Sequence, residues 1–527
     1  MENMERILPE GMPSFADIRR IGALYVDKTD LVWKLAHRGK FNYMSRPRRF
    51  GKSMLVDTLA CYFEGKRELF EGLKIMNLEK EWTVHPVVRL DMSGGGETAD
   101  QLYDFFDRTF AQYETKFGAP AAKARDLTGR LEAIIQTAAN ATGQKVVILI
   151  DEYDFPLQHS WGTDEHEKCT QLYRSVFTVL KSEAVNEQFV FITGITKFTQ
   201  ISLFSVNNNL TNISFLPEYA TICGMTRDEI VDTFMPEIEA MAQKQGWTTD
   251  QALARMKDYY DGYHFSCENM VDVYNPFSVV QALSVGNIKN FWVSSGATTI
   301  LTKFISDLEM NLDRFNICSM DPEELETSDV MEGRDELFLY QSGYLTIKSY
   351  DADVESYTLG FPNTEVRKAL YKVVAPILAA RPGLLMDSTL EDLRTSLLRG
   401  ELSKAKEKLK ALVWDVPYSN KKMQSMDMEE RYRFIISMIL KAAAMDVEVE
   451  HMMADGRIDI LARNKRYIYV MELKLTNAGG IAAAERQIIS KSYAAPFKGD
   501  AREVVALAVE IDDDGKGIVD WKKVPDE

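Results

Sequence analysis

Short apolar runs alternate with longer amphipathic stretches from residue 41 to about residue 235. The runs are rich in β-branched or aromatic residues and lie at 41–45, 87–92, 146–151 and 189–194. The stretches between them repeat apolar residues at helical spacing, at 53–65, 98–118 and 166–184. Strands that alternate with helices build a mainly parallel sheet whose faces are covered by the helices. The pattern therefore predicts an α/β domain over residues 1–235.

The remainder of the chain changes character twice. Residues 236–400 are mostly helical with tyrosine-rich turns, and we expect a helical lid or a winged-helix accessory domain there. An amphipathic helix at 402–414 then opens a compact α+β arrangement over residues 401–527. Its further elements are a helix, two strands joined by a tight turn, a second helix and a last strand, at 428–444, 456–462, 466–475, 480–495 and 503–511. Three domains suit a chain of 527 residues, because a single core rarely organises more than about 300 residues.

Charge and cysteine content limit the classes of protein that fit. The net charge of −17 argues against a protein that coats polyanions over its whole surface. Residues 401–527 carry 21 basic and 22 acidic residues, so this region can face nucleic acid without long-range repulsion. The five cysteines lie at least 44 residues apart, which favours reduced thiols over a disulfide framework or a zinc site. The first residues lack a secretory signal, and no stretch is apolar for about 18 residues, so we expect a soluble, cytoplasmic protein with no membrane partner.

Gly51-Lys52-Ser53 follows the first strand and begins a helix. At that position backbone N–H groups and the helix dipole favour phosphate. Lys52 would reach the β- and γ-phosphates of ATP, and the Ser53 hydroxyl would hold Mg²⁺. The first glycine of the standard loop is replaced by an arginine, and cationic side chains are expected to crowd the phosphates instead. The loop residues assigned to the nucleotide are Arg46, Arg48, Arg49, Phe50, Gly51, Lys52, Ser53 and Met54.

A second acidic motif supports the nucleotide site. The apolar strand VVILIDEYD ends in Asp151 and Glu152, which suit coordination of Mg²⁺ and the orientation of an attacking water. Thr193, at the end of the strand FVFITG, suits a polar sensor of the γ-phosphate. The alternative is that Lys52 is a solvated lysine at a helix start, and that the two acids are a helix N-cap pair.

The C-terminal region contains a second set of carboxylates. Two strands flank a tight turn, so Asp459 and Glu472 are expected on adjacent strands at the same level, with Lys474 on the face of Glu472. Two carboxylates and a lysine on one face suit a divalent cation that polarises a phosphodiester and lowers the pKa of a water. Further contributions are expected from flanking helices, through Glu429 or Glu430 and through Gln487 and Tyr493. The alternative is an edge hairpin with a surface Glu-Lys pair.

Several segments together resemble a known family. YVDKTDLV (25–32), RPRRFGKSML (46–55), LIDEYDFP (149–156), TGITKF (193–198) and SLFSVNNNLTNIS (202–214) resemble the bacterial AAA-ATPase-like family, whose loop is arginine-rich. GRIDIL and MELKL, with Gln487 and Tyr493, resemble the PD-(D/E)XK nuclease superfamily. The resemblance implies a P-loop NTPase core and a restriction-endonuclease-like core, with the helix carboxylate at Glu429 or, less directly, Glu430.

These features predict an ATP-binding and ATP-hydrolysing protein that controls a nuclease domain. The expected cofactors are ATP and Mg²⁺ or Mn²⁺, and the expected partner is nucleic acid, with DNA favoured. The family analogy extends this to defence or mobile-element biology. The sequence is compatible with a homo-oligomer, because an arginine finger supplied by a neighbouring subunit leaves no local sequence signal. The alternative function is a non-cleaving, nucleotide-dependent switch that binds a partner or nucleic acid.

Overall fold

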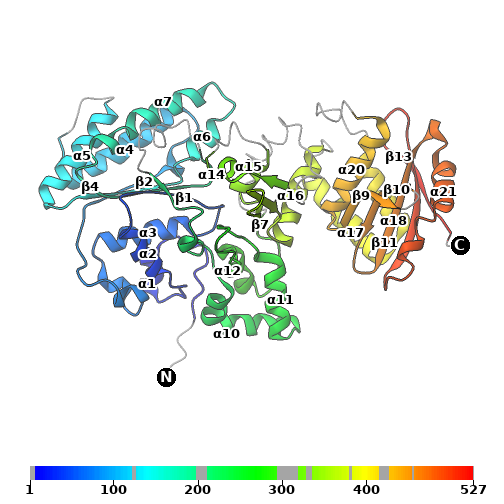
Figure 1. Ribbon diagram of the computed structural model, residues 1–527, viewed down its shortest axis with the longest axis horizontal. Coiled ribbons are helices and arrows are strands. Elements are labelled where there is room, and N and C mark those ends of the chain that lie inside the picture. Colours follow the sequence, from blue (N-terminus) through cyan, green and yellow to red (C-terminus); the bar gives the residue numbers. More distant parts are fainter. Residues whose placement is uncertain are drawn as a thin grey trace. The chain divides into compact units, whose positions relative to one another are not determined.

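The structure, a computed structural model (Figure 1), describes most of the chain. The described residues are 6–120, 126–197, 210–292, 318–327, 335–378, 383–414, 426–453 and 456–525. They form two compact units, one up to Glu365 and one from Val366 onward. The division into regions at residues 235 and 400 stays a prediction. Within the described ranges, no helix is both long and apolar enough to cross a bilayer.

A five-stranded parallel sheet forms the centre of the first unit. Its order is β2-β3-β4-β1-β5, with neighbouring strands parallel throughout. The strands are β1 (Phe41–Ser45), β2 (Val87–Asp91), β3 (Val146–Asp151), β4 (Glu187–Gly194) and β5 (Thr211–Asn212). Every residue of β3 is buried, as expected for a strand covered on both faces. The predicted α/β fold with a parallel sheet is confirmed.

Helices cover both faces of this sheet (Figure 1). On one side lie α4 (Ala99–Phe117), α5 (Leu127–Thr142) and α7 (Glu165–Phe177), and on the other lie α1 (Phe15–Ile21), α2 (Thr29–Ala36) and α3 (Lys52–Phe63). Helix α4 begins with a capping box between Thr98 and Gln101 and ends at the left-handed Gly118. Two short helices, α6 (Phe155–Ser160) and α8 (Val179–Ser182), flank α7. The predicted helix 166–184 is therefore interrupted at Thr178.

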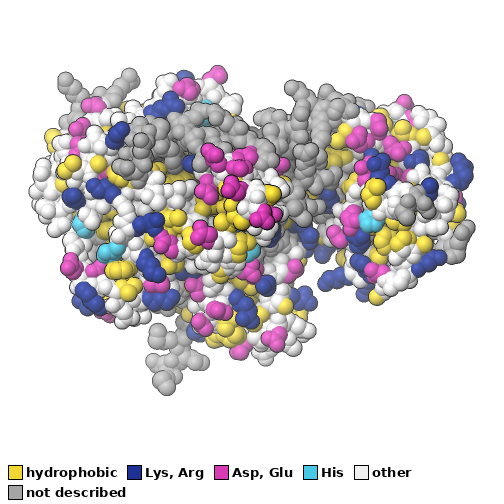
Figure 2. All heavy atoms as spheres, viewed as in Figure 1, with side chains coloured by type: hydrophobic (Ala, Val, Ile, Leu, Met, Phe, Trp, Pro, Cys, Tyr) yellow, Lys and Arg dark blue, Asp and Glu magenta, His cyan; other side chains and the backbone are white. Residues whose placement is uncertain are grey.

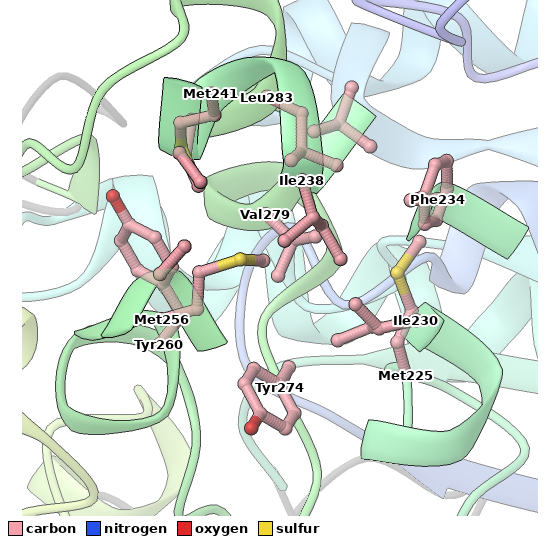
Figure 3. Packing of buried hydrophobic residues seen from close by; sticks show 14 residues of the cluster. Met225, Ile230, Phe234, Ile238, Met241, Met256, Tyr260, Tyr274, Val279 and Leu283 are labelled. Carbon is pink, nitrogen blue, oxygen red and sulfur yellow. The ribbon is translucent and has the colours of Figure 1, made fainter. Parts of the chain in front are cut away.

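Three helices pack around a core of their own beside the sheet. They are α10 (Arg227–Gln245), α11 (Thr249–Tyr260) and α12 (Pro276–Val285). Figure 3 shows Ile238, Met256 and Val279 pointing toward one another in this core. Capping boxes open α10 and α11, which satisfies their first backbone N–H groups. The helical segment thus begins at Arg227.

A small antiparallel sheet follows within the first unit. Its order is β6-β8-β7, from β6 (Cys318–Met320), β7 (Thr346–Asp351) and β8 (Ser356–Gly360). The helices α14 (Pro322–Thr327) and α15 (Asp335–Gln341) belong to the same stretch. Figure 2 shows acidic side chains gathered over this part of the visible face. The predicted accessory region thus contains strands as well as helices.

The second unit contains a mixed five-stranded sheet. Its order is β13-β12-β11-β10-β9, antiparallel except for the parallel pair β11 and β12. The strands are β9 (Asp446–Met453), β10 (Gly456–Arg463), β11 (Tyr467–Leu475), β12 (Glu503–Ile511) and β13 (Ile518–Lys523). The helices are α16 (Thr364–Leu378), α17 (Gly383–Arg399), α18 (Leu402–Val413), α20 (Met428–Ala442) and α21 (Gly480–Ser490). Helix α21 supplies the crossover that a parallel strand pair requires.

Two features of this unit differ from the sequence expectation. The edge strands β9 and β13 extend the predicted three-stranded arrangement on both sides. Helix α21 ends at Ser490 and not at residue 495, because Ser492 adopts a left-handed φ of 51° that a helix cannot continue through. Basic and acidic side chains are interspersed on the visible face of the unit (Figure 2), in line with its near-neutral charge.

Glu187, at the start of β4, is expected to lower the stability of the first unit at alkaline pH. Its side chain is fully buried, and neither carboxyl oxygen has a hydrogen-bond partner. Burial raises its pKa to about 8, from an ordinary value of 4.5. Because the pKa of Glu187 is higher in the folded than in the unfolded state, its contribution to the free energy of unfolding is fully present below pH 4.5 and is lost as the pH rises toward 8. We expect Glu187→Gln to stabilise the protein by about 2–4 kcal/mol at pH 9 and by much less at pH 5.

Thermal and urea unfolding between pH 5 and pH 9 measure this effect. The control is Glu239→Gln, an exposed position on α10, which should change stability by less than about 0.5 kcal/mol. An equal effect of Glu187→Gln at both pH values would show that the ionised carboxyl is not the cause.

Candidate nucleotide and metal sites

The loop between β1 and α3 has the backbone conformation of an anion-binding turn. Gly51 is the N-cap residue of α3 with a φ of 92°, a left-handed value that favours glycine. Helix α3 therefore starts at Lys52, and its first N–H groups open toward the loop. The loop follows the carboxyl end of a strand inside a parallel sheet, which is where ligands bind in such folds. A phosphate is the ligand that this turn suits best.

Lys52 is buried at the head of α3 and turned toward the loop. Its Nζ donates to the carbonyl oxygens of Arg46 and Pro47, at 3.0 and 3.1 Å. Burial lowers the pKa of Lys52, and the nearby carboxylates of Glu152 and Asp151 oppose this shift. A phosphate oxygen would replace these carbonyls as a charged acceptor, and charge-assisted hydrogen bonds are roughly twice as strong as neutral ones.

The two acids after β3 lie beside Lys52, as predicted. Burial raises the pKa of Asp151, and a hydrogen bond with the Ser53 side chain opposes the shift. Glu152 has a left-handed φ of 48°, and its N–H donates to Asp151 Oδ1 at 3.0 Å. A non-glycine residue in this region costs free energy and is found mainly at functional sites. Ser53, Asp151, Glu152 and Lys52 are thus brought together at the carboxyl edge of the sheet.

A cavity of about 400 Å³ opens in front of the loop. Part of its wall is polar and comes from Arg49, Gly51, Lys52, Ser53 and Glu152. Much of the remainder is apolar and includes residues of the N-terminal segment, α10 and α12, among them Met12, Leu24, Val26, Phe234, Phe277 and Val280. A phosphate end beside an apolar slot has the chemistry that a nucleoside triphosphate requires.

The other predicted loop residues divide into two groups. Arg49, Phe50 and Met54 line the cavity, and the Arg49 guanidinium stacks on Phe277 with 3.8 Å to the ring centroid. Arg48 and Thr193 do not line it. Thr193 is fully buried in β4, and its hydroxyl has no hydrogen-bond partner. Of the segment 202–214, residues 202–209 lie outside the described part of the chain.

Arg46 requires a correction, because the structure places its side chain away from the phosphate position. The guanidinium is buried and donates to the carbonyl oxygens of Ser45, Ser214 and Tyr219, at 2.9, 2.8 and 3.1 Å. It also stacks on Phe265 with 4.1 Å to the ring centroid. These carbonyls bind the two terminal nitrogens of the buried guanidinium, whereas its Nε has no hydrogen-bond partner among the described residues, and Arg46 thereby joins chain segments rather than holding phosphate.

We expect Arg46→Met to act on stability and not on nucleotide affinity. The variant removes the guanidinium donor from three carbonyls, of which only that of Tyr219 is known to keep another donor, the N–H of Ile222, and this should cost about 2–4 kcal/mol of folding free energy. Nucleotide affinity, measured well below the unfolding temperature, should stay within about threefold of wild type. Arg49→Ala is the matched variant, and it should weaken binding with a smaller loss of stability. A large loss of nucleotide affinity in Arg46→Met without a loss of stability would instead show that Arg46 contacts the phosphates.

Two residues outside the predicted set complete this site. Lys28 lines the cavity and donates to Glu229 Oε2 at 2.6 Å, which connects the N-terminal segment to the start of α10. Asp154 is buried and accepts from the N–H groups of Ile195 and Thr196, at 3.0 and 2.7 Å. These contacts hold the turn after β3 against the end of β4. Lys28 belongs to the segment YVDKTDLV, but its ion pair could not be predicted locally, because its partner lies 201 residues away.

The carboxylates of the second unit meet across neighbouring strands. The register pairs Ile460 with Met471, and its continuation places Asp459 opposite Glu472. Asp459 Oδ2 accepts from the N–H of Leu473 at 2.8 Å, and both carboxylates are buried. The predicted juxtaposition therefore arises from the strand pairing.

Lys474 lies between two of these acids. Its Nζ is 3.1 Å from Glu472 Oε1 and 3.2 Å from Glu429 Oε1. Burial raises the pKa of Glu472 to about 7, and the charge of Asp459 adds to the shift. Glu472 Oε2 has no hydrogen-bond partner although it is buried. An unsatisfied buried carboxyl oxygen is costly, and a cation at this point would remove that cost.

These residues line a cavity of about 930 Å³. Its wall contains Glu429, Arg433, Arg457, Asp459, Glu472, Lys474, Arg486, Gln487, Lys491 and Tyr493. Glu430 is exposed on α20 and does not line the cavity, whereas Glu429 does. Gln487 Nε2 donates to the Tyr493 hydroxyl at 3.2 Å, which in turn donates to the carbonyl of Arg457 at 2.8 Å.

The donor set of this cavity fits a hard divalent cation. The described residues contain no group of three or more His, Cys, Asp or Glu side chains arranged as a ligand set. Mg²⁺ needs no such group, because it is commonly held by one or two carboxylates and keeps several waters. Asp459 and Glu472 are the pair that would hold it, and the free Glu472 Oε2 supports this.

The strand pairing also brings in residues that the sequence pattern does not single out. Arg433 Nη1 contacts Asp459 Oδ1 at 2.9 Å, and its Nη2 contacts Glu450 Oε1 at 3.1 Å. Glu450, on β9, has a left-handed φ of 55°. Arg457 Nη1 contacts the same Glu450 oxygen at 3.1 Å. One signal for Arg433 is available in the sequence, since it lies one helical turn after Glu429 on the same face of α20.

Comparisons with known proteins match both units. Residues 9–204 match a family described as predicted AAA-ATPase, and residues 427–521 match the PD-(D/E)XK nuclease superfamily. An uncharacterized protein in the vnfD 5′ region of Azotobacter chroococcum is 28% identical over 521 residues, which is 97% of this chain and 98% of that protein. The chain thus contains an AAA-ATPase-like region and a PD-(D/E)XK region in the predicted order.

Two solved structures show weak similarity. The ORC2 protein of Aeropyrum pernix, solved as ADPNP-ADP complexes, matches with a TM-score of 0.29 and 11% identity, over 72% of this chain and 97% of that chain. The CDC6P protein of Pyrobaculum aerophilum matches with a TM-score of 0.26 and 11% identity, over 70% and 95%.

Proposed function

We propose that this protein binds and hydrolyses ATP at the β1–α3 loop and carries a metal-dependent nuclease in its second unit. Two regions support the proposal, since one matches an AAA-ATPase family and the other a nuclease superfamily. The observation that carries the nuclease is the meeting of Asp459, Glu472 and Lys474 in one cavity. Nucleic acid is the substrate class proposed, with DNA favoured.

The nucleotide site supports binding through preformed contacts. Lys52 and the N–H groups at the start of α3 would hold the β- and γ-phosphates, and the apolar wall of the cavity would cover the base. Ser53 and Asp151, already joined by a hydrogen bond, would hold Mg²⁺ between them. Glu152 reaches the cavity with a raised pKa caused by burial, which suits a group that orients water.

The second cavity supports cleavage of a phosphodiester. A divalent cation held by Asp459 and Glu472 would supply a polarised phosphate and a water of lowered pKa. Lys474 would stabilise the charge that develops on the phosphate, and Glu429 holds its ammonium group in place. Gln487 lines the same cavity and donates its Nε2 to the Tyr493 hydroxyl, and its amide would face the substrate.

A cleavage assay with the intact protein tests this function. Single- and double-stranded DNA and RNA are incubated with ATP and either Mg²⁺, Mn²⁺ or a chelator. Metal-dependent cleavage of at least one substrate supports the nuclease. No cleavage of any substrate, combined with nucleotide-dependent binding to nucleic acid, would instead support the non-cleaving switch.

A further inference from the structure

Three acidic residues lie in one row across the sheet of the second unit. The β9–β10 register pairs Ile458 with His451 and Ile460 with Val449, which places Glu450 opposite Asp459. The β10–β11 register continues the row to Glu472. Glu450 has a left-handed φ of 55°, and β9 nevertheless continues from Asp446 to Met453 with the same register on both sides of this residue.

Arg433 bridges the first two members of this row. Its Nη1 is 2.9 Å from Asp459 Oδ1 and its Nη2 is 3.1 Å from Glu450 Oε1. The side chain is 12% exposed and lines the cavity. Because Asp459 Oδ2 already accepts from the N–H of Leu473, both oxygens of Asp459 are engaged by the protein.

In this arrangement the Arg433 guanidinium competes with any cation that Asp459 would bind. A hydrogen-bonded Arg-carboxylate pair is worth more than a neutral hydrogen bond, and a divalent cation must break it to reach Asp459 Oδ1. Glu450 is the second anchor, which keeps Arg433 in the cavity after Asp459 is released. A guanidinium held there matches the geometry of a phosphate.

We propose that Arg433 is a built-in counter-ion of this centre, which occupies Asp459 while no divalent cation is bound and then turns to the substrate phosphate. This inference rests on the proposed nuclease function and names a regulation of the same site. In the metal-free protein Arg433 competes with the cation for Asp459. In the metal-bound protein it binds the substrate phosphate. Arg433 is not released from the cavity, because Glu450 retains it.

Mn²⁺ binding to the full chain, followed by electron paramagnetic resonance, tests the competition without any cleavage. We expect Arg433→Gln to bind Mn²⁺ about tenfold more tightly than wild type, because the ion pair no longer competes. At saturating Mn²⁺ the same variant should cleave nucleic acid at least about tenfold more slowly and bind it more weakly, since the phosphate contact is lost.

Arg457→Gln is the matched control. It removes one positive charge from the wall of the same cavity and from the same Glu450 oxygen, without touching Asp459. Its Mn²⁺ affinity should rise less than about threefold, because only long-range repulsion is relieved. Arg433→Lys, which keeps the charge but not the planar fork, should fall between wild type and Arg433→Gln. If Arg433→Gln does not fold, the Mn²⁺ affinity of Arg433→Lys tests the same competition.

The outcomes separate this inference from the function on which it rests. If Mn²⁺ binds wild type through Asp459 and binds Arg433→Gln with unchanged or weaker affinity, the counter-ion proposal is wrong. The proposed nuclease site is not affected by that result. An equal gain in Arg457→Gln overturns it as well, because the effect is then general electrostatics. Absence of Mn²⁺ binding to wild type overturns both.

Discussion

Lys52→Ala is expected to abolish Mg²⁺-ATP binding, with a loss of affinity of at least about a hundredfold. Lys52 is the cation at the head of α3, and its Nζ donates to two backbone carbonyls at 3.0 and 3.1 Å. A triphosphate would offer charged acceptors at the same place, and two lost charge-assisted hydrogen bonds of about 1.5–3 kcal/mol each account for the effect. Isothermal titration with a non-hydrolysable ATP analogue measures it.

Lys145→Ala is the control for the change in net charge. Lys145 is exposed in the first unit, just before β3, and does not line the cavity. Its affinity should equal that of wild type. Because Lys52→Ala also removes two internal hydrogen bonds, Lys52→Met and a thermal unfolding curve show whether the fold persists. Unchanged affinity in a folded Lys52 variant would remove the nucleotide site from the β1–α3 loop.

Glu472→Gln and Asp459→Asn are each expected to lower the rate of metal-dependent cleavage by about a hundred- to a thousandfold. Each variant removes a charged oxygen from the pair that would hold the cation, whose contribution to the transition state is several kcal/mol. The rate is measured under saturating substrate at fixed Mg²⁺, and Mn²⁺ binding is measured beside it. Loss of both signals assigns the acids to the metal.

Stability separates this effect from unfolding. Burial raises the pKa of Glu472 to about 7, so ionisation of this carboxyl costs stability as the pH rises from 4.5 toward 7. Glu472→Gln removes that cost, and the metal-free variant should be at least as stable as wild type at pH 8. Glu430→Gln, on the exposed side of α20, is the matched control and should keep the wild-type rate. Full activity of both acid variants would overturn the assignment of the metal site.

The sequence predicted the elements of both cores from their periodicity. The fully buried β3 and the strands β10 and β11 were recognisable because runs of apolar residues end at polar turns. The edge strands β9 and β13 were not, because an edge strand buries few side chains: within these two strands only Val447, Ile518 and Trp521 are buried. Such strands are stabilised by their neighbours rather than by their own pattern.

The candidate sites divide in the same way. Lys52, Ser53, Asp151, Asp459, Glu472 and Lys474 were predicted, because each lies within a motif whose spacing carries its chemistry. Spacing along α20 left Glu429 and Glu430 open, and only the packing of the helix decides which side chain enters the cavity. The loop sequence grouped Arg46 with its arginine neighbours, although its guanidinium packs among carbonyls more than 160 residues away.

By itself, the sequence determined the main strands and helices of the two cores and the motifs at their ends, since periodicity and turn chemistry act between residues close in the chain. Only the tertiary structure decided that Arg46 is internal, that Lys28 meets Glu229, and that Arg433 stands between Asp459 and Glu450. Those partners are chosen by strand register and helix packing, and a long side chain pairs with whichever charge the fold brings within reach.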